Sequence, residues 1–117
     1  MNESFTLAAL TLESDACPFE DWFRSLRDRQ MRVRIAARLA RVRAGNFGDH
    51  RSVGGGVSEL RLDIGPGYRL YYALQEATIV ALIIGGDKSS QDRDIEEAKR
   101  LWKEYHEQAE RFHHYTG

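Results

Sequence analysis

The chain has 117 residues, 42% hydrophobic and 30% charged, and its net charge of −1 is typical of one soluble globular domain over residues 1–117. Its single cysteine, Cys17, excludes an internal disulfide and a multi-cysteine zinc site and favours a reducing compartment. The first residues do not resemble a leader peptide and the apolar run 79–84 is too short to span a bilayer, so the sequence predicts a cytoplasmic protein without membrane association.

The N-terminal part of the chain predicts a strand followed by two helices. Alternating apolar residues favour a strand over about 4–12, and Pro18 marks the start of a helix. A second helix is expected over about 30–44, ending at Gly45. Two short helices of this kind are expected to pack side by side as an αα-hairpin. The apolar stripe of the first helix consists of Phe19, Trp22, Phe23 and Leu26.

From residue 57 the sequence takes on the two-residue period of a strand. A short strand is expected before residue 57, near 50–53. In the strand that begins at residue 57, Leu60 and Leu62 share an apolar face, whereas Glu59 and Arg61 share a polar one. This alternation predicts a half-buried strand.

A turn at Gly65-Pro66-Gly67 joins this strand to the next, because glycine permits positive φ and proline presets its own. The next strand places Arg69 and Tyr71 on its polar face. If the turn closes tightly, Arg61 lies opposite Tyr71 and Asp63 opposite Arg69. The loop therefore predicts a β-hairpin with cations on one face.

The last part of the chain predicts a buried strand and a long helix. Residues 77–84 are apolar on both faces, as in a central strand. Asp87 is expected to make local hydrogen bonds in the turn that follows. Ser89 and Asp92 match a capping box, so the C-terminal helix and tail are expected from about residue 90. The order β-α-α-β-β-β-β-α indicates an α+β domain.

Positive charge gathers in the middle of the chain, where residues 24–69 hold eleven arginines and four acids. Such a segment favours an anionic partner, although many of these arginines also fit the solvated face of a helix. The strongest candidate site consists of Arg61, Arg69, Tyr71 and Lys88. Guanidinium and ammonium groups bind phosphate and stabilise charge that grows on it, and a tyrosine can move a proton or stack on a base.

The alternative for this cluster is a cross-strand network in which Arg61 and Arg69 pair with Glu59 and Asp63. His50, in a glycine-rich loop, is a weaker candidate as a proton shuttle. Ligand spacing indicates no metal and no cofactor. Cations on this face suit a phosphate backbone such as that of RNA, and the expected RNA-binding residues are Arg51, Arg61, Arg69 and Lys88.

Several motifs together resemble the addiction-module killer proteins, a HigB-like branch of the RelE/ParE toxin superfamily. The resemblance extends from about Phe19 to Trp102. The residues that carry it are Gly45-Asn46-Phe47-Gly48-Asp49, Gly56-Val57-Ser58-Glu59-Leu60-Arg61, Gly65-Pro66-Gly67-Tyr68-Arg69-Leu70-Tyr71-Tyr72 and Gly85-Gly86-Asp87-Lys88 through Asp94-Ile95.

The resemblance implies two N-terminal helices packed on a mostly antiparallel twisted sheet, with a C-terminal helix. It also implies the toxin of a type II toxin–antitoxin pair, a metal-independent endoribonuclease that cuts mRNA on the ribosome and blocks translation. Arg69 matches the phosphate-binding arginine of the Gly-Tyr-Arg motif, and Arg61 and Lys88 match basic positions. Near Asp94, where some members carry a catalytic tyrosine, this chain has no aromatic residue, so Tyr71 or His50 would have to replace it.

The family implies a cognate antitoxin with a helix-turn-helix domain. Two other functions stay open at this point. ParE-like members share the fold but inhibit DNA gyrase by protein–protein contact, and the chain could also be an inactive partner-binding module. The arginines on the polar face of the hairpin favour the nuclease.

Overall fold

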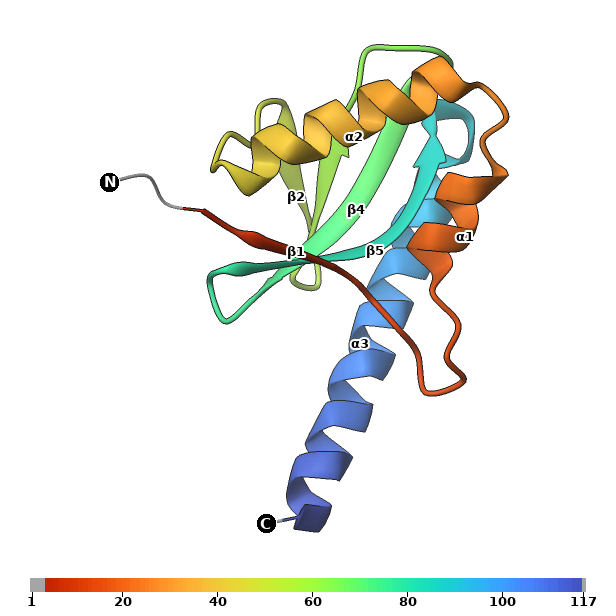
Figure 1. Ribbon diagram of the computed structural model, residues 1–117. Helices are drawn as coiled ribbons and strands as arrows, with labels where there is room; N and C mark the ends of the chain where they lie inside the picture. The colour runs from red at the N-terminus through yellow and green to blue at the C-terminus, as the bar shows by residue number, and fades with distance from the viewer. Residues whose placement is uncertain (1–3, 117) are drawn as a thin grey trace.

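The chain folds into a mixed five-stranded sheet with helices on both of its faces (Figure 1). This computed structural model describes residues 4–116, and the side chains of residues 4–107. The strands are β1 (Thr6–Ala9), β2 (His50–Gly54), β3 (Val57–Arg61), β4 (Tyr68–Gln75) and β5 (Ile79–Asp87). The helices are α1 (Pro18–Ser25), α2 (Arg29–Arg43), a 3₁₀ turn η1 (Lys88–Ser90) and α3 (Gln91–Thr116). The predicted α+β class and element order are confirmed.

The sheet has the strand order β1-β5-β4-β3-β2. The strands from β2 to β5 pair antiparallel, and only β1 is parallel to its neighbour β5. β1 is shorter than the predicted strand 4–12, because the chain turns back after Leu10, where Leu12 N–H donates to the Ala16 carbonyl oxygen at 2.8 Å. The predicted end of α2 at Gly45 is confirmed by the left-handed φ of 96° there.

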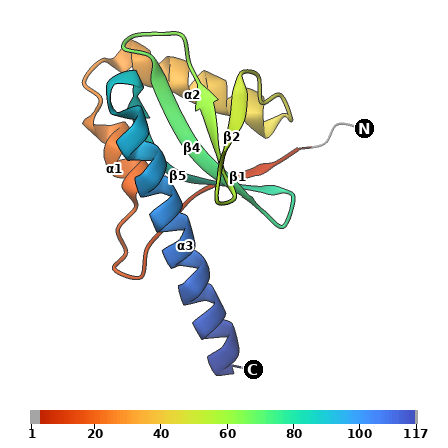
Figure 2. The same cartoon turned by 180° about the vertical axis from the view of Figure 1, so that it is seen from behind.

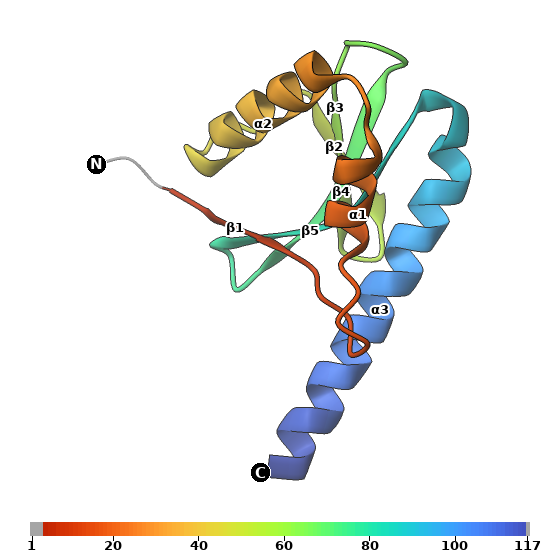
Figure 3. The same cartoon turned by 45° about the vertical axis from the view of Figure 1, so that its right-hand side comes forward.

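Each face of the sheet has its own apolar core. α1 and α2 cover one face, and α3 crosses the other (Figures 2 and 3). On the first face, Ile35 and Val42 of α2 pack with Leu60, Leu70 and other apolar residues. On the second face, Ala98, Leu101 and Trp102 of α3 pack on Tyr71 and its neighbours. The polar face of the predicted hairpin is therefore not open: α3 covers much of it, because its own apolar stripe needs burial.

α1 and α2 do not form the predicted αα-hairpin. α1 packs against β5, whereas α2 lies on the same face of the sheet at a steep angle to α1 (Figure 3). The prediction was wrong because each helix buries its stripe on the sheet rather than on the other helix. None of the described helices is long and apolar enough to cross a membrane.

The predicted register of β3 against β4 was wrong by two residues. Arg61 lies opposite Arg69, and Glu59 lies opposite Tyr71. The loop is centred one residue earlier than expected, because Leu62 N–H donates to the Tyr68 carbonyl oxygen at 3.0 Å. Gly65 and Gly67 both take positive φ inside that longer loop. The shift places two arginines side by side across the strands.

α3 begins differently from the predicted Ser89–Asp92 capping box. The Asp87 carboxylate accepts a hydrogen bond from Ser89 N–H at 2.8 Å and caps η1, with Ser90 as its capping-box partner. The expected local role of Asp87 is confirmed. Two pairs of residues with capping-box spacing occur in this stretch, Asp87 with Ser90 and Ser89 with Asp92. The earlier pair forms the cap.

Two adjacent glycines at the end of β5 allow close packing on opposite faces. The Trp22 ring lies where a Cβ on Gly85 would point, and the Asp94 carboxylate lies where a Cβ on Gly86 would point. Asp94 is held there by the Ser90 hydroxyl at 2.5 Å. A side chain at Gly86 would therefore push the first turn of α3 away from the sheet.

We expect Gly86→Ala to lower the free energy of unfolding by about 2 kcal/mol, because the added methyl group overlaps Asp94 Oδ2. Urea denaturation of the purified variant measures this loss. In the double variant with Asp94→Ala the overlapping carboxylate is gone, so the two losses should sum to more than the double variant shows. Strictly additive losses would contradict the proposed clash.

Candidate functional site

The α3-facing side of the sheet carries two rows of polar side chains near the start of α3. Residues directly opposite one another in antiparallel strands point to the same face. One row runs from Arg51 of β2 through Glu59 of β3 to Tyr71 of β4. The other row consists of Arg61 and Arg69. The fold thus brings together residues that are far apart in the sequence.

Lys88 completes this group from the next element. A Cβ on Gly67 would lie 3.7 Å from Arg69 Nη1 and 3.3 Å from Lys88 Cβ, so both side chains pass the same glycine. Lys88 is exposed, the side chain of Arg61 is 37% exposed, and Arg69 is only 8% exposed. We call Arg51, Arg61, Arg69 and Lys88 the basic cluster. Its cations lie at the end of the sheet, with Arg69 at the bottom and the others around it.

Glu59 neutralises part of the basic cluster. It is fully buried, and its Oε1 accepts from Arg51 Nε at 3.0 Å and from Arg61 Nε at 3.2 Å. Its Oε2 accepts from Gln91 Nε2 of α3 at 2.9 Å. Burial by itself would raise the pKa of Glu59, but the hydrogen bonds from Gln91, Arg51 and Arg61 outweigh burial and lower it. Glu59 is therefore an ionised carboxylate that ties β2, β3 and α3 together.

Arg69 has no comparable partner in the part of the chain that the structure describes. Its Nη1 donates to the neighbouring Tyr68 carbonyl oxygen at 3.0 Å, and its buried Nε has no hydrogen-bond partner. The alternative network, in which Arg69 pairs with Asp63, is absent among these residues. Arg61 does pair with Glu59, as that alternative expected. A guanidinium whose charge is not paired with a carboxylate favours the binding of an anion at its exposed edge.

Tyr71 is part of the core under α3 rather than an open catalytic group. Its ring is fully buried, and its hydroxyl has no hydrogen-bond partner among the described residues. Burial first, and then the nearby Glu59 carboxylate, raise the pKa of Tyr71 well above its ordinary value. Tyr71 is therefore neutral at physiological pH and a poor proton acceptor. Its ring packs in the core below the basic cluster and supports the cluster structurally.

We expect Tyr71→Phe to leave the free energy of unfolding within about 0.5 kcal/mol of the wild type, because the lost hydroxyl makes no hydrogen bond to any described residue. If the protein is the nuclease that the resemblance implies, RNA cleavage should change less than about threefold, since general acid or base catalysis typically contributes about 100-fold or more. Thermal denaturation and a cleavage assay measure the two effects. A 100-fold loss of cleavage with unchanged stability would instead make Tyr71 the proton carrier.

His50 does not join the basic cluster. It lies opposite Leu60 and so faces the α2 side of the sheet, where its ring is 5.8 Å from that of Phe47. His50 Nδ1 lies 2.8 Å from the Gly48 carbonyl oxygen. Among the described residues no three His, Cys, Asp or Glu side chains are grouped so that they could hold a metal ion.

The sequence did not predict Gln91 as a site residue, and it did not predict the central position of Glu59. Glu59 entered only as a possible partner of an arginine, although it is the centre of the network. Gln91 lies 32 residues further along the chain and contacts Glu59 only because α3 begins above β3. Nothing in the sequence predicts this contact, since a glutamine in the first turn of a helix is common.

The chain is similar in sequence to a protein of Haemophilus influenzae. Over 86 residues the chain is 46% identical to an uncharacterized protein of that bacterium, and the match covers 74% of this chain and 87% of the relative. The chain belongs to the family of this Haemophilus influenzae protein. No family model matches the chain. No solved structure matches it.

Proposed function

We propose that the protein is the toxin of a type II toxin–antitoxin pair in the RelE/ParE superfamily, and that it cleaves mRNA, most effectively on the ribosome. One observation carries the proposal. Arg61 and Arg69 lie directly opposite one another on the same face of the sheet, and of the two only Arg61 is paired with a carboxylate of the described residues. Like charges in this position repel one another, which a bound phosphate would relieve.

The basic cluster suits cleavage by internal attack of a ribose 2′-OH. In that reaction the 2′ oxygen bonds to phosphorus, the bond to the 5′ oxygen breaks, and negative charge grows on the phosphate oxygens. Arg69 would bind those oxygens from below, and Lys88 and Arg61 from the sides. Charge stabilisation of this kind supplies about 3 kcal/mol per well-placed donor. We assign proton transfer to water or ribosomal groups, because the Tyr71 hydroxyl is buried and His50 faces away.

Expression in a bacterium under a tight promoter tests this proposal. We expect growth arrest and new mRNA 5′ ends within coding regions, mapped by primer extension. A helix-turn-helix antitoxin, expressed together with the protein, should suppress both effects.

Two outcomes would replace the proposed nuclease function with another function. Intact mRNA with an SOS response and gyrase-linked DNA breaks would identify a ParE-like gyrase inhibitor. Normal growth at a verified level of folded protein would identify a partner-binding module without toxic activity.

A further inference from the structure

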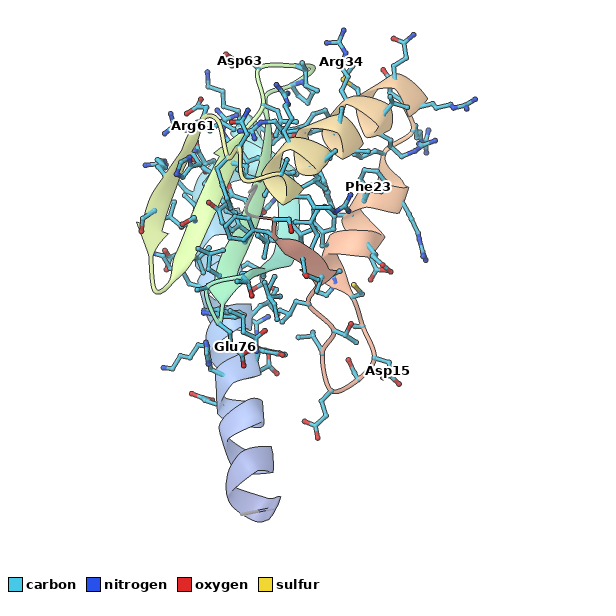
Figure 4. The ribbon with its side chains drawn as sticks, turned by 60° about the vertical axis from the view of Figure 1, so that its left-hand side comes forward. Asp15, Phe23, Arg34, Arg61, Asp63 and Glu76 are labelled. Atoms are coloured by element: carbon cyan, nitrogen blue, oxygen red, sulfur yellow. The ribbon has the colours of Figure 1, made fainter. Side chains whose placement is uncertain are left out.

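A second arginine-lined surface lies between α2 and the end of β3. It consists of two adjoining hollows of about 220 and 290 Å³, which share Arg38, Arg41, Arg61 and Asp63 in their linings. Figure 4 shows Arg34 of α2 at the same end of the molecule as Arg61 and Asp63. We call this surface the α2 groove. The residues that line only the smaller hollow are Asn46, Gly48 and Asp49.

Arg38 is held in place within the α2 groove. It is 7% exposed, and its Nη2 donates to the Asp49 carbonyl oxygen at 3.1 Å. Gly48 takes a left-handed φ of 60°, and a Cβ there would lie 3.0 Å from Arg38 Nη2 and 3.1 Å from its Cζ. The backbone at Gly48 and Asp49 therefore lies against the guanidinium. No ion pair joins Arg38 to a carboxylate within the described residues.

The α2 groove gathers like charges. Three arginines of α2 line it (Arg34, Arg38 and Arg41), together with Asp49 and Asp63, and the charge of Arg61 at its border is paired with Glu59, which leaves an excess of one positive charge. Burial, and then the nearby Arg41, lower the pKa of Arg38, so the fold holds this guanidinium against both desolvation and repulsion. Such an arrangement is unfavourable without an anion, and a phosphate would offset it.

We propose that the α2 groove binds phosphate groups of the RNA strand held by the basic cluster, with Arg34, Arg38 and Arg41 guiding the strand beyond Arg61. This inference rests on the proposed function. Arg61 borders the groove and also belongs to the cluster, so the two surfaces meet at this residue, at the end of β3. The smaller hollow has no apolar side chain in its lining, so a phosphate backbone suits it better than a peptide, which needs apolar anchors.

The test measures binding of a short, fluorescently labelled 2′-O-methyl oligonucleotide, which lacks the attacking hydroxyl and stays intact. Arg34 and Arg41 are exposed, so the Arg34→Gln/Arg41→Gln variant should remain folded. We expect its Kd to rise about tenfold at low salt, and the slope of log K against log salt to shrink by about 1.4, or 0.7 per lost phosphate contact. The matched control is Arg29→Gln/Arg43→Gln, which removes the same charge from exposed positions of α2 outside the groove.

Each other outcome counts against the groove. An unchanged slope, equal losses in both double variants, or no binding by the wild type would overturn the inference. Loss of affinity for a glutamate-rich peptide, with oligonucleotide binding intact, would assign the groove to an acidic protein partner instead. Failure of the proposed function looks different: the groove variants would still lower oligonucleotide affinity, but the wild type would cut no mRNA in cells.

Discussion

Under the proposed function, Arg69→Ala is expected to lower mRNA cleavage by about 100-fold or more and to abolish growth arrest on induction. The reason is the position of Arg69 at the bottom of the basic cluster, where no carboxylate of the described residues pairs with it. Loss of one preorganised donor to a developing oxyanion typically removes about 3 kcal/mol of transition-state stabilisation. Single-turnover cleavage of a defined mRNA, with growth curves in parallel, measures the loss.

The fold should survive this substitution. Among the described residues the Arg69 side chain makes one hydrogen bond, to the Tyr68 carbonyl oxygen, so the expected loss in free energy of unfolding is no more than about 2 kcal/mol, chiefly from packing of its aliphatic stem. Arg24→Ala, at an exposed position of α1, controls for the loss of one charge. Arg69→Lys should recover part of the activity, since it restores the charge without the fork. Full activity in Arg69→Ala would remove the cluster as the site of cleavage.

Glu59→Gln is expected to lower the free energy of unfolding by about 2 to 4 kcal/mol at neutral pH, because it leaves Arg51 and Arg61 without their shared carboxylate. The sign of the pH dependence follows from the lowered pKa of Glu59. Its contribution is fully present above about pH 4.3, the ordinary pKa of a glutamate, and is lost as the pH falls through the lower pKa of the folded state. Wild type and variant should therefore converge in acid.

Urea denaturation between pH 3 and pH 7 measures this convergence, and Asp63→Asn is the matched control. Asp63 is an exposed carboxylate that borders Arg61 but forms no ion pair within the described residues, so its removal should change stability by less than about 0.5 kcal/mol. A difference between wild type and Glu59→Gln that stays constant across this pH range would mean that the Glu59 charge does not hold the three elements together.

The elements of the fold follow from local patterns in the sequence. The two-residue alternation beyond Val57 predicted β3 and β4, and the Pro18 and Gly45 signals predicted where α1 begins and where α2 ends. These features depend on residues within one turn or one strand of each other, so a single sequence contains the information. The same local reasoning also singled out Arg61 and Arg69, because basic residues recur on one face of two neighbouring strands, and Lys88, because it directly follows the last strand.

Contacts between distant elements could not be predicted in this way. A shift of two residues in the β3–β4 register keeps every side chain on its face, so alternation could not separate Arg61 opposite Tyr71 from Arg61 opposite Arg69. The position of α3 over the polar face, which buries Tyr71 and brings Gln91 to Glu59, depends on how its apolar stripe packs across the sheet. The local sequence pattern therefore determines which residues form the basic cluster. Long-range packing determines which of them is neutralised, which is buried and which is free.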